Sequence, residues 1–231
     1  MQTGPAESTA HPLQALARSN QNGDPRDFSD KLWLLLVAGA KLEATSDYGR
    51  TALLVAASNE RAAAFDALLA AGAQVSALRV NCGPDAAHFN TVLHELAAKN
   101  NGSLIPRVLA TRALDVDVRT GPVAGRGTPL HIAAYKDAPR AVSALLAGGA
   151  SLTATDGENS MTALQLAIAM SSAKAARPLV EATPRAERAR LRRDAARAEA
   201  ACARDAAARP GDAAVAAKLA AAREVALLLA A

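Results

Sequence analysis

Apolar residues recur along this chain at the spacing of short amphipathic helices, and the helices come in pairs. One clear pair occupies residues 128–150. Its apolar set forms one face in each half of the stretch, and the set is Leu130, Ala133, Val142, Leu145 and Leu146. Neither short helix can bury such a face alone, so each pair must pack against its neighbours. The pattern therefore predicts a stack of paired helices with a continuous, thin core.

A sequence motif repeats with the helix pairs. The fullest copy reads Gly-Thr-Pro-Leu-His-Ile-Ala-Ala from Gly127 and closes with Leu-Leu-Ala-Gly-Gly-Ala at Ala150. The motif threonines of the four copies are Thr51, Thr91, Thr128 and Thr162. Their separations are 40, 37 and 34 residues (91 − 51, 128 − 91 and 162 − 128). A period in this range is typical of a solenoid of repeated helical units.

The motif resembles that of the ankyrin repeat family, in which Thr-Pro-Leu-His-x-Ala opens a first helix and a second helix ends Leu-Leu-x-x-Gly-Ala. The resemblance covers residues 11–182, with His11 in the threonine position of a degenerate first copy. It implies an all-α ankyrin-repeat solenoid of about five helix-turn-helix repeats with finger loops. We expect a disordered N-terminal tail at 1–10, the ankyrin repeat domain at 11–182 and a C-terminal helical cap at 183–231.

The start and end of each helix pair carry recognisable capping residues. Thr128 suits a helix N-cap, with Pro129 at the first helical position. Gly72 and Gly149 suit the left-handed cap that ends the second helix. These positions fix where each helix should begin and end.

The motif histidines are expected to be structural. The resemblance implies that His94 and His131 hydrogen-bond back to the threonine that opens their own repeat and to neighbouring backbone. Leu54 and Gln165 replace the histidine in the other two copies. We therefore expect the turns at Leu54 and Gln165 to be less tightly held.

Composition narrows the class of protein. The chain is 51% hydrophobic but only 3% aromatic, so its core must rely on alanine and aliphatic residues. The two cysteines, Cys82 and Cys202, lie far apart, as expected for free thiols in a reducing compartment. No apolar run is long enough to cross a membrane, and the N-terminus lacks the pattern of a secretory signal. We expect a cytoplasmic, monomeric protein with the alanine and arginine usage of a bacterial high-GC genome, with a secreted effector as the other option.

Positive charge gathers near the C-terminus. Residues 185–209 hold eight arginines and four acids, a net +4 (8 − 4) that equals the net charge of the whole chain. Interleaved acids and the lack of aromatics favour a solvated helix face with internal ion pairs. The alternative is a helix that binds nucleic acid or another anionic surface.

No arrangement of residues indicates catalysis, a metal site or a cofactor. The glycine-rich stretch 121–127 lacks the Gly-Lys-Ser/Thr of a phosphate-binding loop, and 156–160 lacks the spaced acids of a calcium loop. His88 lies near Cys82, but no further ligand stands at metal-binding spacing. We therefore expect a protein that is not an enzyme and takes no small-molecule substrate.

Two enlarged loops stand out, at residues 78–90 and 119–127. They precede adjacent repeats, so we expect them to lie side by side at one edge of the concave face, and loops carry function more often than scaffolds do. The resemblance implies partner contacts at the finger tips and the exposed ends of the first helices. The predicted partner-binding residues are Tyr48, Arg50, Arg79, His88, Phe89, Arg119, Arg126, Tyr135, Lys136, Asp156 and Glu158.

The function expected from these observations is non-enzymatic binding of a specific protein partner through the concave face and fingers. Two uses stay open. The protein could neutralise one target, as an inhibitor, immunity or regulatory factor does, or it could be an effector that engages host proteins. The long fingers favour one dedicated partner.

Overall fold

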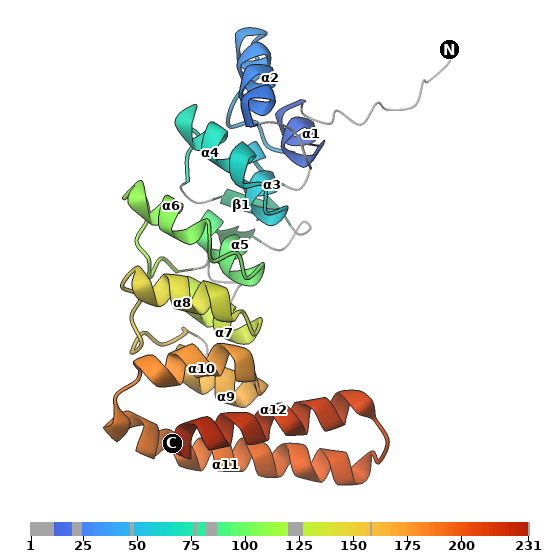
Figure 1. The fold of residues 1–231 in the computed structure, drawn as a ribbon, viewed down its shortest axis with the longest axis vertical. Coiled ribbons are helices and arrows are strands. Elements are labelled where there is room, and N and C mark those ends of the chain that lie inside the picture. Colours follow the sequence, from blue (N-terminus) through green and yellow to red (C-terminus); the bar gives the residue numbers. More distant parts are fainter. Residues whose placement is uncertain are drawn as a thin grey trace.

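The computed structural model describes residues 12–19, 25–46, 49–75, 78–81, 87–119, 127–157 and 159–230. The expected tail at 1–10 lies outside these ranges. Within them, helix pairs stack one on another in a single column, from α1 and α2 at one end to α11 and α12 at the other (Figure 1). The predicted helical ankyrin solenoid is confirmed.

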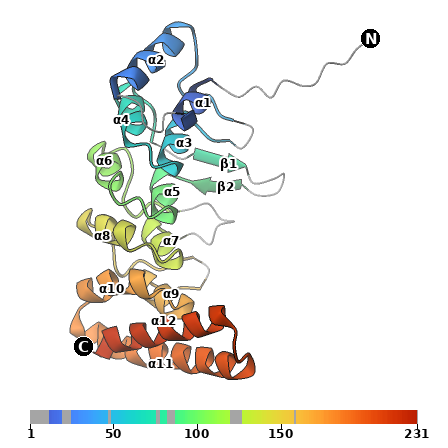
Figure 2. The ribbon, with the colours of Figure 1, turned by 45° about the vertical axis from the view of Figure 1, so that its right-hand side comes forward.

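Five of these helix pairs, within the described residues, correspond to repeats. The first helices are α1 (Pro12–Ser19), α3 (Ala52–Ser58), α5 (Val92–Ala98), α7 (Pro129–Tyr135) and α9 (Ala163–Met170). The second helices are α2 (Pro25–Val37), α4 (Ala62–Ala70), α6 (Ile105–Ala110), α8 (Pro139–Ala147) and α10 (Ala173–Ala182). Figure 2 shows α4, α6 and α8 along one side of the column and α3, α5 and α7 along the other.

Small and aliphatic side chains fill the space between the pairs. The leucine two residues after each motif threonine is at most 3% exposed, as are alanines further along the first helices. These leucines are Leu53, Leu93, Leu130 and Leu164. Because alanine has no bulk beyond Cβ, it lets neighbouring helices approach closely, which explains a buried core with so few aromatic residues.

The motif histidines join consecutive repeats. In His131, Nδ1 accepts a hydrogen bond from the amide of Thr128 at 3.2 Å and lies 2.9 Å from its hydroxyl. Since Nδ1 accepts from an amide, the proton is on Nε2, which donates to the carbonyl of Met161 in the next repeat at 3.0 Å. His94 does the same with Thr91 and with the carbonyl of Gly127. The implied histidine role is therefore present, and the backbone carbonyl that each histidine contacts lies in the next repeat.

The two copies without histidine differ from each other. Gln165 completes the same capping box, because its Oε1 accepts from the amide of Thr162 at 2.9 Å. The expectation of a looser turn at Gln165 was therefore wrong: an amide oxygen reaches the position of the imidazole nitrogen. At Leu54 the amide donates to the Thr51 hydroxyl at 3.4 Å. The leucine side chain has no acceptor for the Thr51 amide, so this turn has one hydrogen bond fewer, as expected.

A left-handed residue follows each of α3, α5, α7 and α9 at the same repeat position. Asn100 (φ 55°) and Asp137 (φ 52°) are two of these. Their side-chain oxygens accept from backbone amides at the start of the next repeat's second helix, at 2.8 Å from Arg140 and 2.8 Å from Ala175 respectively. They satisfy amides that a helix N-terminus otherwise leaves without partners. The third and fourth repeats thus each cap the second helix of the repeat that follows.

Four of the second helices, α2, α4, α6 and α8, also end in left-handed residues. Gly72 (φ 89°) and Gly149 (φ 88°) do so as predicted. In the third repeat Arg112 takes the same place at φ 53°, a conformation that costs a side-chain-bearing residue about 1 kcal/mol or more.

The first long finger contains a β-hairpin. Strand β1 (Leu78–Asn81) pairs antiparallel with β2 (Ala87–Asn90), with Leu78 opposite Asn90. Figure 2 shows the hairpin projecting from the first-helix side of the column. Residues 120–126 of the second long finger lie outside the described ranges, so the expectation that the two fingers lie side by side stays untested.

Helices α11 (Arg185–Ala208) and α12 (Ala213–Ala230) close the C-terminal end as an antiparallel pair (Figure 1). Leu191, Ala195, Val225 and Leu229 are buried in the core that continues from the last repeat. These two helices cover the last repeat at the place where the sequence predicts a helical cap. No helix in the described part of the chain has the length and apolar character needed to cross a membrane.

Candidate functional site

The exposed ends of the first helices, together with the described parts of the fingers, are here called the finger face. Its helical part consists of the positions seven and eight residues after each motif threonine, where the helix turns away from its neighbours. In the last two repeats these positions are Tyr135 with Lys136 and Ala169 with Met170. Tyr135 is 51% exposed and Met170 is 44% exposed. Large apolar side chains therefore lie open at this end of the face.

Tyr135 and Lys136 interact with each other. The Lys136 ammonium lies 5.2 Å from the centroid of the Tyr135 ring, within the range of a cation–π contact. The pair stands on α7, whose start is fixed by the two bonds of His131. Both residues were predicted from the sequence to contact a partner, and both are accessible.

Arg50 is held inside the array. Its guanidinium donates to Glu95 at 2.9 Å and to the Ser58 hydroxyl at 2.6 Å, so it joins the second repeat to the third. The Arg50 and Glu95 side chains are only 31% and 16% exposed. The geometry gives Arg50 a structural link between repeats and leaves little of its charge for a partner.

Asp156 is also used internally. It is 9% exposed, and its carboxylate accepts from the amides of Asn159 at 3.0 Å and Met161 at 2.9 Å. Burial acts to raise the pKa of this carboxyl, but the hydrogen bonds from Met161 and Asn159 outweigh it and hold the pKa below its ordinary value. Asp156 therefore shapes its finger from within.

The remaining predicted residues are placed less fully. Arg119 is exposed at the base of its finger and donates to the carbonyl of Thr155 at 2.8 Å. Arg79 and Phe89 are opposite each other in the hairpin register, and His88 is opposite Val80. Three predicted residues lie outside the described ranges, namely Tyr48, Arg126 and Glu158.

The structure adds a groove that the sequence did not suggest. A cavity of about 460 Å³ opens between α9 and α11, and its lining is Met161, Gln165, Ile168, Ala169, Asp194, Arg197 and Ala198. A second cavity of about 480 Å³ shares Ala169 and Ala198 with it and reaches Lys218 on α12. The groove exists because small alanine side chains, Ala169 and Ala198, line it where α9 and α11 meet. The sequence could not predict it, because it depends on how the two helices pack.

The buried histidines are neutral supports. Burial lowers the pKa of His94 to about 4, against hydrogen bonds to the backbone that act to raise it. Burial likewise lowers the pKa of His131. Within the described ranges no three metal-ligating side chains come together, and Cys202 is a buried free thiol.

Comparison with protein-family models agrees with this geometry. A model described as ankyrin repeats (3 copies) matches residues 93–189, from α5 to the first turn of α11. The matched stretch contains both motif histidines and the Gln165 capping box. The fold and the sequence match lead to the same assignment: residues 93–189 are ankyrin repeats.

Proposed function

We propose that this protein binds one specific protein partner through its finger face and catalyses no reaction. Ankyrin repeats generally mediate protein–protein interaction, which supports the class of function. The observation that carries the proposal is the exposed Tyr135–Lys136 pair on a helix fixed at both ends. Tyrosine in such a position is a favoured hot-spot residue at protein interfaces.

Rigidity supports the same proposal. The His131 and Asp137 side chains fix α7 to the next repeat, at 3.0 Å to Met161 and 2.8 Å to Ala175. A face ordered before binding loses less conformational entropy when the complex forms. The α9–α11 groove beside Met170 provides an apolar recess at the end of this ordered surface.

Charge indicates the kind of partner. Three acids near the described part of the finger face are engaged within the protein: Glu95 by Arg50, Asp137 by the amide of Ala175, and Asp156 by its own loop. Lys99 and Lys136 are exposed and have no acidic partner among the described residues. The face therefore suits a partner with acidic and apolar side chains. Either use, neutralisation of one target or engagement of a host protein, is compatible with such a surface.

Binding of nucleic acid along the whole of α11 is less well supported. Residues 185–193 hold five arginines and one glutamate, whereas 194–209 hold three arginines and three acids. In the second half all three acids lie close to an arginine, in the pairs Asp194–Arg197 (3.8 Å), Glu199–Arg223 (3.5 Å) and Asp205–Arg209 (2.5 Å). A track for a nucleic-acid backbone needs unpaired cations along its length, and here most of the arginines without an acidic partner lie at one end.

Affinity capture with matched variants tests the proposal. The finger-face variant carries Tyr135→Ala, Lys136→Ala and Met170→Ala. The control variant carries Arg140→Ala and Lys174→Ala, two exposed residues on the second helices α8 and α10. Wild-type and control proteins should retain the same single protein from native lysate at low and moderate salt, and the finger-face variant should lose it.

Two outcomes would contradict the proposal. One is equal capture by the finger-face variant and the wild type, with circular dichroism showing that both are folded. The other is retention of nucleic acid or many acidic proteins that moderate salt releases, which would move the function to α11.

A further inference from the structure

The unbalanced positive charge of the chain lies at one end of the cap. Residues 185–193 carry a net +4 (five arginines less one glutamate), equal to the formal net charge of the whole chain. Within this stretch Arg185, Arg188 and Arg192 are spaced three and four residues apart, so they share one face of α11. The face is turned toward the C-terminal end of α12.

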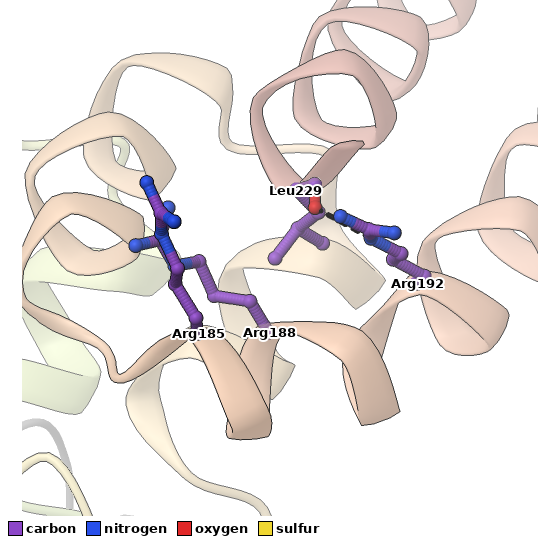
Figure 3. A pocket seen from close by; sticks show the side chains of 4 residues that line it. All are labelled: Arg185, Arg188, Arg192 and Leu229. Atoms are coloured by element: carbon purple, nitrogen blue, oxygen red, sulfur yellow. Dashed lines mark hydrogen bonds between the residues drawn. The ribbon is translucent and has the colours of Figure 1, made fainter. Parts of the chain in front are cut away.

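These three arginines and Leu229 line one pocket of about 210 Å³ (Figure 3). In the close-up, Arg185 and Arg188 extend on one side of Leu229 and Arg192 on the other. The pocket is smaller than the roughly 300–1,000 Å³ typical of sites for drug-sized molecules. Its size suits a small charged group rather than a nucleotide.

Arg192 has a structural role at this pocket. Its Nε donates to the carbonyl of Leu229 at 2.8 Å and its guanidinium also donates to the carbonyl of Ala230 at 3.1 Å. These are the last carbonyls of α12, which carry the negative end of the helix dipole. Arg192 therefore occupies the acceptors that would otherwise repel an anion.

Arg185 and Arg188 have no such partner. None of the ion pairs or side-chain hydrogen bonds among the described residues involves either guanidinium. The Nε of Arg188 is shielded from solvent and makes no hydrogen bond. A buried donor without an acceptor is costly and rare in folded proteins. An anion between two guanidinium groups that line one pocket would supply the missing acceptor and offset their like charges.

We propose that this pocket binds the phosphate group of a phosphate monoester. A phosphate monoester carries about −1.5 to −2 charge at neutral pH, which matches two unpaired guanidinium groups. Guanidinium groups bind phosphate oxygens in pairs of parallel hydrogen bonds. Arg185 is the first residue of the 24-residue α11, so the positive end of that helix dipole adds to the attraction. Leu229 offers an apolar contact to the carbon that bears the ester.

The site is separate from the finger face. In Figure 2 the turn between α11 and α12 lies on the first-helix side of the column, whereas the C-terminal end of α12 lies on the second-helix side. A phosphate group here would leave Tyr135 and the α9–α11 groove accessible. This proposal therefore does not depend on the protein-binding function of the finger face.

Titration of the full chain with inorganic phosphate tests the proposal, with acetate as a singly charged comparison. The readout is the NMR shift of the arginine Nε–H signals, supported by calorimetry. We expect saturable 1:1 binding that shifts the Arg188 signal first and is at least tenfold weaker for acetate. A second arm compares a peptide that carries phosphoserine with the same peptide carrying serine. A phosphopeptide that binds more tightly than inorganic phosphate identifies a phosphorylated chain as the source, and equal binding identifies a free phosphate compound.

Matched variants decide whether the pocket is responsible. Arg188→Gln and Arg185→Gln should each weaken phosphate binding at least tenfold, and Arg188→Lys should recover part of the loss. Arg193→Gln removes the same charge from an exposed position of α11 outside the pocket and should change binding less than twofold. Unchanged thermal unfolding of the variants shows that the fold is intact. The proposal is overturned if binding is not saturable, or if Arg188→Gln and Arg193→Gln weaken it equally.

Discussion

The buried motif histidines should make this protein lose stability between pH 7 and pH 5. Both are neutral in the folded state, because Nδ1 accepts from a threonine amide while Nε2 donates to the next repeat. The pKa of His94 is about 4 in the folded protein, against 6.5 for an exposed histidine. The unfolded chain therefore takes up a proton at a higher pH than the folded chain, so acid favours unfolding. The stabilisation is fully present above pH 6.5 and is lost as the pH falls toward 4.

The size of the effect follows from the two pKa values. A fall from 6.5 to about 4 corresponds to roughly 3 kcal/mol once both states are protonated, and to about 2 kcal/mol at pH 5. His131 adds to the loss in the same direction, since burial also lowers its pKa. Asp156, whose pKa is likewise lowered, contributes mainly below this window, because an unfolded aspartate titrates near pH 3.9.

Urea unfolding followed by circular dichroism at pH 7, 6, 5.5 and 5 measures this loss. The informative variant is His94→Gln with His131→Gln, because Gln165 shows that glutamine completes the same capping box in this protein. We expect the variant to lose about 1 kcal/mol at pH 7 for each inter-repeat bond that glutamine fails to make. Its stability should nevertheless change little between pH 7 and pH 5. An equally steep pH dependence in wild type and variant would refute the assignment of the effect to these histidines.

Three further changes in stability follow from backbone and capping geometry, all measured by urea unfolding at pH 7. Arg112→Gly should raise the free energy of unfolding by up to about 1 kcal/mol, because glycine adopts φ 53° without strain; a lower value would contradict the strain argument. Asp137→Ala should lower it by about 1 kcal/mol by removing the cap on the Ala175 amide, and Asp137→Asn, which keeps an acceptor, should recover most of the loss. Glu95→Gln should lower it by roughly 1–2 kcal/mol because the partly buried Arg50 then loses its counter-charge; no change would mean that the link between these repeats is weak.

The repeat architecture could be read from the sequence because its determinants are local. Thr128, Pro129 and Gly149 each set the start or end of a helix through their own backbone preferences, and the same preferences recur in each copy. The structural role of His131 likewise depends on a threonine three residues away. Motifs of this kind need no knowledge of how distant segments meet.

The candidate site was less predictable because it depends on distant contacts. Alignment of the repeats predicted that Arg50 and Asp156 lie on the finger face and contact a partner. In the structure Arg50 instead pairs with Glu95, 45 positions away, and Asp156 accepts a hydrogen bond from Asn159 in its own loop. The α9–α11 groove and the pocket at Arg188 both depend on the path of α11 across the last repeat. The sequence showed an arginine-rich helix with interleaved acids, but not which arginines would lack a partner.

The contacts between repeats have a direction. His94 reaches Gly127, Asn100 reaches Arg140, and Asp117 accepts from the amide of Ser151 at 3.0 Å, so each side chain satisfies a group in the repeat that follows. During synthesis on the ribosome, a repeat therefore cannot complete its own polar contacts until its successor has emerged. Ser171, which occupies the place of Asn100 in the last repeat, lies 3.7 Å from the Cys202 sulfur of α11. Each repeat thus completes its polar contacts only after the next repeat has been synthesised. The final repeat completes them only when the last helices are released from the ribosome.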